Sequence, residues 1–467
     1  MTPVGARGSL APLRRRFRRR FRRGVCLPAA LCGLALSFGG GPGIAHAQTL
    51  GEAVAMALKS NPKVLGARTA AQAVSYDITG AKSQMNARFG LIVEPAYGYI
   101  RGAGTGGRGD LGVQAVKPIY DSGRTDNEVA RQRARLAGAN QELELARADI
   151  ALKVADTYVE LVKQQRLAEL AEDYVAAIAA LNGRVEQIVK LDRGRGYDLL
   201  QTQSRLQQAR LISASRQGSV LEAQAALAQL VGRPIVQTTE PPLPAPLPQT
   251  LEQAVAVLDL HPTVMAGLAE IEAARRAAAV ARAWDKPAFS VRGRVNSPEF
   301  PIGERQWFGG YDVGIVTDWN PFDGGAGAAR AAAANAQVLA VEDSAAAARL
   351  ELAGEVVKHW TQMRSRAART GSLDDLVEGA RKVRAAYWEQ FQIGRRSILD
   401  LLNAENETYQ SRLSAITERI ELLQVRYRLV GSLARLTDYL GIEPALPVAE
   451  PDQETTGAAG ANLPVLR

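Results

Sequence analysis

The chain contains the stretch TLGEAV at residues 49–54 and a near copy, TLEQAV, at residues 250–255. Three further pairs of matching stretches follow in the same order in both halves. They are NP at 61–62 with HP at 261–262, YDSG at 120–123 with FDGG at 322–325, and DLL at 198–200 with DLL at 400–402. Self-similarity at a fixed spacing indicates an internal duplication, so we interpret the chain as two repeats of one structural unit.

Each repeat contains a run of more than 100 residues without proline, rich in Ala, Leu, Gln, Glu and Arg, which are strong helix formers. Each run is broken once, by a glycine-containing turn. We therefore predict two helical hairpins, at about 124–232 and about 326–440. Their first helices, about 124–190 and 326–392, would each be roughly 100 Å long at about 1.5 Å per residue. A single globular core does not accommodate helices of that length.

The return segment of the second hairpin carries apolar residues at alternating steps of four and three, including Tyr409, Leu413, Ile416 and Ile420. Such steps over several heptads are typical of a coiled-coil seam. A lone amphipathic helix does not explain a seam of this length, so we expect the long helices to pack against partner helices.

Two short segments precede each long run. They lie at about 89–100, 110–119, 287–296 and 310–320. Along them apolar residues alternate with small or charged ones, which is the pattern of transmembrane β-strands of about ten residues. Arg292, Arg294 and Asp318 fall on one common side, which we predict to line a barrel lumen. The opposite side is apolar and is expected to face lipid.

Aromatic residues cluster at the ends of these segments, as they do in the interfacial girdles of membrane proteins. The predicted girdle consists of Tyr97, Tyr99, Trp307, Tyr311 and Trp319. The polar, glycine-rich stretches 102–109 and 297–310 are expected to be loops that face the outside. Four strands cannot close a barrel, and an open sheet edge in lipid leaves backbone groups unpaired. We therefore expect the chain to oligomerise.

Residues 1–47 have the pattern of a cleaved export signal. Nine of the 57 basic residues are arginines in this segment, and an apolar stretch and a small-x-small site at Ala45–Ala47 follow them. The 48 basic residues that remain equal the 48 acidic ones, so the net charge of +9 belongs to the signal. The mature chain is then neutral, and a nucleic-acid partner is not expected.

The mature chain offers few groups for chemistry. Both cysteines lie in the signal, and only His261 and His359 remain of the three histidines. No disulfide framework, thiol nucleophile or Cys/His metal site can be assembled from these residues. We predict a protein that is not an enzyme and has no cofactor or metal. We also expect no apolar run near the roughly 18 residues of a membrane helix.

The remaining segments set the boundaries between the repeats. We place the first repeat at 48–240, a stiff proline-rich linker at 241–249, the second repeat at 250–442 and a disordered tail at 443–467.

The chain resembles the TolC family of outer-membrane channel-tunnels over residues 48–442. The resemblance rests on the opening motif of each repeat, on PIYDSGR at 118–124, and on GRRSILDLLNAENE at 394–407. The last stretch is more similar to the branch that serves type I secretion than to the drug-efflux branch. The fold class implied is α+β: a duplicated unit of β-hairpin and long helical hairpin, three copies of which form a twelve-stranded barrel and a helical tunnel through the periplasm.

The resemblance also implies a gate, in which the helix tips close the periplasmic end through polar bonds and acidic rings. Asp400 matches an acidic ring position, Arg396 the tip arginine, and Tyr197 and Asp198 the partner tip. Asn403 stands where some members have a second aspartate. The alternative interpretation of Asp198 and Asp400 is helix capping, because acidic residues favour a helix N-terminus.

The implied partners are two further copies of the chain, a periplasmic adaptor, an inner-membrane ATP-binding exporter, outer-membrane lipid and an exported polypeptide such as a toxin or adhesin. The alternative is the outer-membrane component of a tripartite efflux pump for drugs or other small molecules. Two other classes explain less. An adaptor would carry a single hairpin and usually an inner-membrane anchor, and a structural coiled coil leaves the four alternating segments unexplained. No nucleotide-binding loop is present in the sequence, so energy would have to come from a partner.

Overall fold

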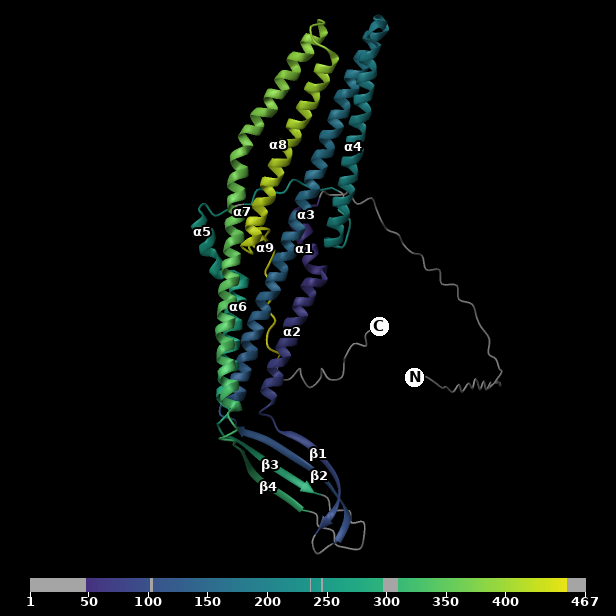
Figure 1. Cartoon of the computed structure of the whole chain (residues 1–467). Coiled ribbons are helices and arrows are strands. Elements are labelled where there is room, and N and C mark those ends of the chain that lie inside the picture. Colours follow the sequence, from purple (N-terminus) through teal and green to yellow (C-terminus); the bar gives the residue numbers. More distant parts are fainter. Residues whose placement is uncertain (1–47, 101–103, 236, 245–246, 297–309, 452–467) are drawn as a thin grey trace, which may run out of the picture. The chain divides into compact units, whose positions relative to one another are not determined.

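The computed structural model describes residues 48–100, 104–235, 237–244, 247–296 and 310–451, which form two helical hairpins and one sheet (Figure 1). The helices of the first repeat are α1 (Leu50–Ser60), α2 (Pro62–Ser83), α3 (Arg124–Leu191) and α4 (Gly196–Val231), with a 3₁₀ turn η1 (Arg193–Arg195). Those of the second are α5 (Leu251–Ala256), η2 (Val257–Leu260), α6 (Pro262–Arg282), α7 (Ala326–Gln392), α8 (Ile398–Ser432) and α9 (Leu436–Tyr439). The same order of elements in both halves is what the duplicated sequence predicts.

Helices α1, α2, α5 and α6 lie in stretches to which the sequence patterns assigned no structure. The repeated motifs are the starts of these helices. Thr49 and Glu52 form a capping box at α1, and the Thr250 hydroxyl caps α5. Before Pro62 and Pro262, the side chains of Asn61 and His261 cap α2 and α6. Proline suits the first helical position because its missing N–H would have no partner there.

The first helix of each long hairpin begins and ends within one residue of its predicted bounds. Glycine residues start both first helices, since Gly123 and Gly325 hold left-handed backbone at the N-cap positions. The hairpins lie side by side (Figure 1), and α3 packs against α2, α4, α6 and α8. One contact of this seam is a stacked pair, Tyr174 on α3 and Tyr409 on α8, with ring centroids 4.6 Å apart.

The strands form one antiparallel sheet in the order β1 (Arg88–Ile100), β2 (Gly104–Tyr120), β3 (Ala288–Asn296) and β4 (Gly310–Asp318). The expected loop at 102–109 is wrong in most of its length, because residues 104–109 pair with the end of β1. Glycine has a low intrinsic strand propensity, but hydrogen bonding to a neighbouring strand overrides that preference. Most of the other expected loop, 297–309, lies outside the described residues.

The motif PIYDSGR joins the two repeats where the sheet meets the helices. The Arg124 guanidinium donates hydrogen bonds to the carbonyl oxygen of Ala283, at 3.1 and 2.6 Å, and to that of Lys286, at 2.7 Å. The Ser122 hydroxyl donates to the carbonyl oxygen of Pro287 at 2.7 Å. These bonds tie the start of α3 to the turn between α6 and β3, so the sheet is anchored on both repeats.

Buried tyrosines attach the linker region to the helices. The Tyr158 hydroxyl donates to the carbonyl oxygens of Gln48 and Thr239, at 2.7 and 2.9 Å. The Tyr427 hydroxyl donates to the carbonyl oxygen of Pro242 at 2.6 Å. Proline lacks an N–H donor, and these hydroxyls satisfy carbonyl groups in a segment that has no regular secondary structure.

The predicted disordered tail, 443–467, is partly ordered. Residues 443–451 run extended along α3, where Asn140 bonds both backbone groups of Val448: its Nδ2 donates to the carbonyl at 3.1 Å, and its Oδ1 accepts from the amide at 2.9 Å. This single amide replaces the strand partner that an extended segment would otherwise need. Residues 452–467 lie outside the described part of the chain.

The expectation of no long apolar run is also wrong. The stretch Leu251–Arg282 contains an 18-residue window that is long and apolar enough to cross a membrane by composition. It is not one helix, however, because α5, η2 and α6 share it and a break falls at His261. Helix α6 lies against both α3 and α7, and its alanines Ala273 and Ala278 are buried.

Candidate functional site: the sheet faces and the helix tips

The sheet has one apolar and one polar face, as the alternation predicted. Val291 lies opposite Ile315, and Arg294 lies opposite Asp312. Opposite residues of antiparallel strands share a face, so Arg292, Arg294 and Asp318 lie on the same side. On the other side large apolar side chains are open to solvent in the isolated chain: Leu91 and Ile315 are each 70 % exposed.

The predicted aromatic girdle is described in part. Tyr99, Tyr311 and Trp319 are exposed near strand ends, and the Trp319 indole donates to the carbonyl oxygen of Asp285 at 2.9 Å. Tyr97 lies in β1 opposite Gly107. Trp307 lies outside the described residues.

The tip of the first hairpin contains an arginine–aspartate pair. Helix α3 ends at Leu191, and the η1 turn leads directly into α4. Arg195 closes this turn and donates from Nε and Nη2 to Oδ2 of Asp198, both at 2.9 Å. Asp198 is therefore a first-turn acid that pairs with the residue three positions back, rather than the N-cap residue. The side chain of Tyr197 is exposed.

The tip of the second hairpin contains a capping box. Asp400 Oδ2 accepts hydrogen bonds from the Ser397 amide at 3.3 Å and from its hydroxyl at 2.9 Å, and the Asp400 amide donates back to that hydroxyl at 3.2 Å. This confirms the capping interpretation of Asp400. Nη1 of Arg396 lies 3.9 Å from Oδ2 of Asp400, and Cζ of Arg396 lies 4.4 Å from the centroid of the Tyr387 ring. Asn403 is exposed on the same helix.

Two arginines of the first hairpin contact aromatic rings of the second. The Arg195 guanidinium lies 5.3 Å from the centroid of the Phe391 ring, and Arg184 lies 4.3 Å from that of Trp388. Phe391 is only 3 % exposed, so its contact is shielded from water, and cation–π pairs gain strength when desolvated. The structure thus joins the two tips through residues that the motif comparison did not select.

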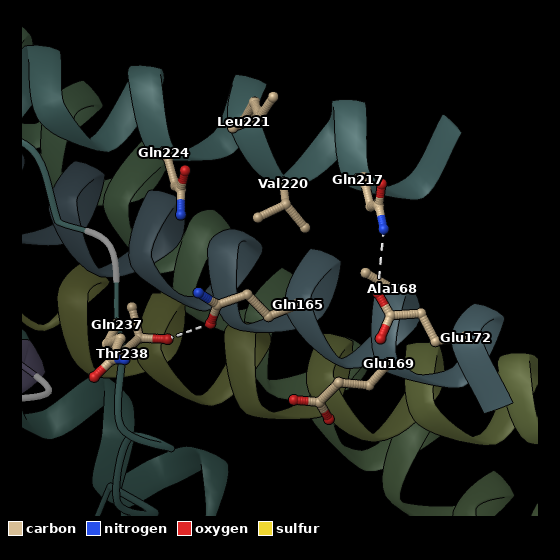
Figure 2. A pocket seen from close by; sticks show the side chains of 10 residues that line it. All are labelled: Gln165, Ala168, Glu169, Glu172, Gln217, Val220, Leu221, Gln224, Gln237 and Thr238. Atoms are coloured by element: carbon tan, nitrogen blue, oxygen red, sulfur yellow. Dashed lines mark hydrogen bonds between the residues drawn. The ribbon is translucent and has the colours of Figure 1, made fainter. Parts of the chain in front are cut away.

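A groove with polar and apolar lining residues lies between α3, α4 and the residues before the linker (Figure 2). Its volume is about 660 Å³. Thr238 donates to Gln165 at 2.5 Å, and Gln217 donates to Glu172 at 3.2 Å. The lining residues offer amide, hydroxyl and carboxylate groups and include no His, Cys or Lys.

A second cavity, of about 420 Å³, contains both histidines of the described chain. His261 and His359 line it together with Asp149, Asp156 and Arg428. Arg428 Nε donates to both carboxylate oxygens of Asp156 at 3.0 Å. Burial nevertheless raises the pKa of Asp156, and Arg428 opposes that shift. The described residues contain no group of three or more His, Cys, Asp and Glu side chains arranged to hold a metal ion.

A sheet with one exposed apolar face, joined to helices too long for a globular core, is the architecture that the sequence analysis expects of an outer-membrane channel. The chain belongs to the outer membrane efflux protein family, whose model matches residues 53–233 and 254–441. The TolC-family resemblance is thereby confirmed, and the protein is an outer-membrane channel of a Gram-negative bacterium that extends into the periplasm.

Individual relatives agree with this family. Outer membrane efflux protein BepC of Brucella suis biovar 1 (strain 1330) is 22 % identical over 416 residues, which cover 86 % of this chain and 89 % of BepC. The outer-membrane channel OprN superimposes with a TM-score of 0.72 at 20 % identity, covering 82 % of this chain and 89 % of OprN. VceC of Vibrio cholerae superimposes with a TM-score of 0.70 at 17 % identity, covering 82 % and 96 %. At these identities the structures show a shared fold.

The duplication provides an internal comparison for the buried histidine. His261 Nδ1 accepts the Thr263 amide at 3.1 Å, whereas in the first repeat Asn61 Oδ1 accepts the Lys63 amide at 3.0 Å. Burial lowers the pKa of His261. Protonation would remove the acceptor and place a positive charge at a helix N-terminus, which the helix dipole disfavours.

We predict that His261 makes stability depend on pH. Its pKa in the folded state is depressed below the ordinary value of about 6.5, so its stabilisation is present above that pH and is lost as the pH falls through the folded-state value. His261→Asn should keep the cap and remove this loss, which is of the order of 0.5–2 kcal/mol. Thermal unfolding of detergent-solubilised protein between pH 7 and pH 5 measures the difference.

Other ionisable side chains line the same cavity. They are Asp149, Asp156, Glu355, His359 and Arg428. These groups are present in both wild type and His261→Asn. The difference in pH dependence between the two proteins therefore comes from the residue that caps α6. The converse variant, Asn61→His, should introduce a dependence of the same sign in the first repeat. Parallel stability curves for wild type and His261→Asn would contradict the prediction.

Proposed function

We propose that three copies of this chain form one channel, in which twelve strands close a barrel through the outer membrane and the helices continue it as a tunnel. The chain is then a passive exit duct. An inner-membrane transporter supplies the energy, and a periplasmic adaptor connects that transporter to the channel. The observation that carries the proposal is the exposed apolar face of the sheet, which only lipid or another protein can cover.

The duplication supports the closed ring. In the first repeat α3 packs against α2 on one side and α6 on the other. In the second repeat α7, the counterpart of α3, packs against α6 but makes no comparable contact with α2 among the described residues. The exposed Leu339 and Leu350 on α7 and the exposed Leu65 and Tyr76 on α2 are candidates for the missing contact. A second copy would supply it, and rotational symmetry closes such head-to-tail contacts into a ring.

In a barrel, adjacent residues of β4 face opposite sides, so we expect them to differ in their tolerance of a charged substitution. Ile315→Arg places a charge on the face assigned to lipid and should cost about 2–4 kcal/mol, whereas Val316→Arg, on the face of Arg292, should mainly change conductance. Folding into detergent-resistant oligomers and single-channel conductance are the measurements. The two variants carry the same substitution on one strand, so equal folding defects would show that the faces are wrongly assigned.

We propose that the joined tips form the periplasmic gate. Arg195 bridges the hairpins by binding Asp198 on its own tip and the Phe391 ring on the other. Arg396 and Asp400 form a second, longer pair at 3.9 Å. Tyr197 and Asn403 are exposed, and would face the constriction if three copies converge. Individual contacts of this kind contribute only about 0.5–2 kcal/mol, so a docked partner could separate the tips.

Loss of the bridge should loosen the closed state. We expect Arg195→Ala to raise the resting conductance of trimers in a planar bilayer, because it removes both the ion pair and the ring contact. The matched control is Arg193→Ala, which removes the same charge from the same turn. Equal conductance of both variants, with trimers intact, would place the gate elsewhere.

For the substrate, we propose small molecules exported by a tripartite efflux pump. The family description and the name of BepC both support efflux. Export of an unfolded polypeptide by a type I system is the second candidate, favoured by the stretch LNAENE at 402–407. A deletion strain complemented with the wild-type chain separates them. We expect deletion to lower the inhibitory concentrations of several toxic compounds and to leave secreted proteins unchanged; loss of one secreted protein alone would favour the second candidate.

A further inference from the structure

Three side chains of α3 hold the extended segment 443–451, which we call the strap, by its backbone. They lie three and four residues apart, so they share one face of the helix. The strap contains three prolines, which donate no backbone hydrogen bond, so it cannot form regular structure of its own. The contacts are Arg147 Nη2 with the carbonyl oxygen of Glu443 at 2.5 Å, Glu144 Oε1 with the Ala445 amide at 2.8 Å, and Asn140 with both backbone groups of Val448.

The far end of the strap binds α2 and α3 together. The Glu450 carboxylate pairs with Lys82 in the last turn of α2 and with Arg133 of α3, the latter at 3.3 Å. Val448 packs against a small apolar cluster to which both helices contribute. The buried members of this cluster are Ile78 and Ala81 of α2 and Val129 and Leu136 of α3.

Helix α2 has few other contacts. Among the described helices and strands it packs only against α3 and α1. Leu65 and Tyr76 of α2 are exposed, and they are candidates for the contact with the next copy. The position of this candidate contact surface therefore depends on how firmly α2 is held on α3.

The second repeat joins the equivalent helices in a different way. By the spacing of the YDSG and FDGG motifs, the position equivalent to Asn140 is Glu342. Glu342 accepts a hydrogen bond from Arg275 at 2.7 Å, so a direct ion pair links α7 to α6. In the first repeat the same position binds the strap instead. The chain has one C-terminus, so only one of the two helix pairs can be held in this way.

We propose that the strap is a clamp that fixes α2 on α3 and thereby keeps α2 in place for contact with the next copy of the chain. The proposal rests on the proposed ring. It assigns to the C-terminal segment a role in assembly: the strap binds within its own chain, and the surface that it positions binds the neighbour.

Hydrogen exchange of the protein extracted in detergent tests the clamp. In Asn140→Ala we expect the α2 amides to exchange at least about fivefold faster, because both hydrogen bonds to Val448 are lost. Alanine is a better helix former than asparagine, so α3 itself is not weakened. The matched control is Asn335→Ala, the same substitution at an exposed position of α7, which should leave α2 unchanged.

A second pair of variants tests the other end of the strap. Glu450→Gln removes the charge that pairs with Lys82 and Arg133, and it should also speed exchange in α2. The control is Glu443→Gln, because Glu443 contacts α3 through its backbone carbonyl. Unchanged exchange of α2 in both Asn140→Ala and Glu450→Gln would overturn the proposal.

The oligomer provides the readout that separates a clamp from a merely local contact. We expect the oligomers of Asn140→Ala and Glu450→Gln to dissociate in detergent at a lower temperature than those of wild type and the two controls. Variants that loosen α2 but leave the oligomer unaltered would overturn the proposal. A wild-type protein that forms no oligomer, although α2 loosens in the variants, would instead refute the ring.

Discussion

The structure depends on one constraint: a single chain cannot cover the apolar face of its sheet. Side chains such as Leu91 and Ile315 are largely exposed on that face, and β1 and β4 form the two outer edges. Water disfavours the apolar face, and lipid disfavours the unpaired backbone of the edges. The proposed barrel satisfies both demands together, because lipid covers the faces while neighbouring copies pair the edges.

The same reasoning explains why the helices are so long yet only partly buried. Helix α3 is enclosed by α2, α4, α6 and α8, and much of its length is buried. Helix α7 is almost equally long, but few of its residues are buried in the isolated chain. The two repeats derive from one duplicated unit, so packing within a single repeat does not explain why α3 is more buried than α7. The difference follows if α3 lies inside the chain's own arc and α7 forms its border with the next copy.

The sequence predicted the long helices and the strand faces well, because each depends on a local pattern. The proline-free run, with the glycine-containing turn that breaks it, located α7 at its observed ends. The period of two assigned Arg292 and Asp318 to one face. The sequence patterns did not predict helices α1 and α2, although Thr49 with Glu52 is a capping box and Asn61–Pro62 is a helix start. The strand at 104–109 could not be predicted, because pairing with β1 overrides the low strand propensity of its glycines.

The candidate gate was predicted less completely, for a physical reason. The motif located Asp198, Arg396 and Asp400, which lie on the two turns. It did not locate Phe391 and Trp388, whose importance comes from arginines roughly 200 residues away in the chain. Whether a residue of one hairpin meets a residue of the other depends on how far the two hairpins are shifted along each other. That shift is set by packing along the whole coiled-coil seam, and no local sequence pattern specifies it.

Equivalent positions of the two repeats make different contacts at the helix tips. Asp198 and Asp400 are equivalent, and each binds back to the residue three positions before it. In the second repeat that residue is Ser397, which completes a capping box and ends its interactions within its own turn. In the first repeat it is Arg195, whose guanidinium is large enough to bind the acid and still cover the Phe391 ring. Where the second repeat has a short cap, the first repeat has a long cation, and the same position then contributes a contact between hairpins instead of only a local helix start. A duplicated channel can make its two tips unequal in this way without changing the fold.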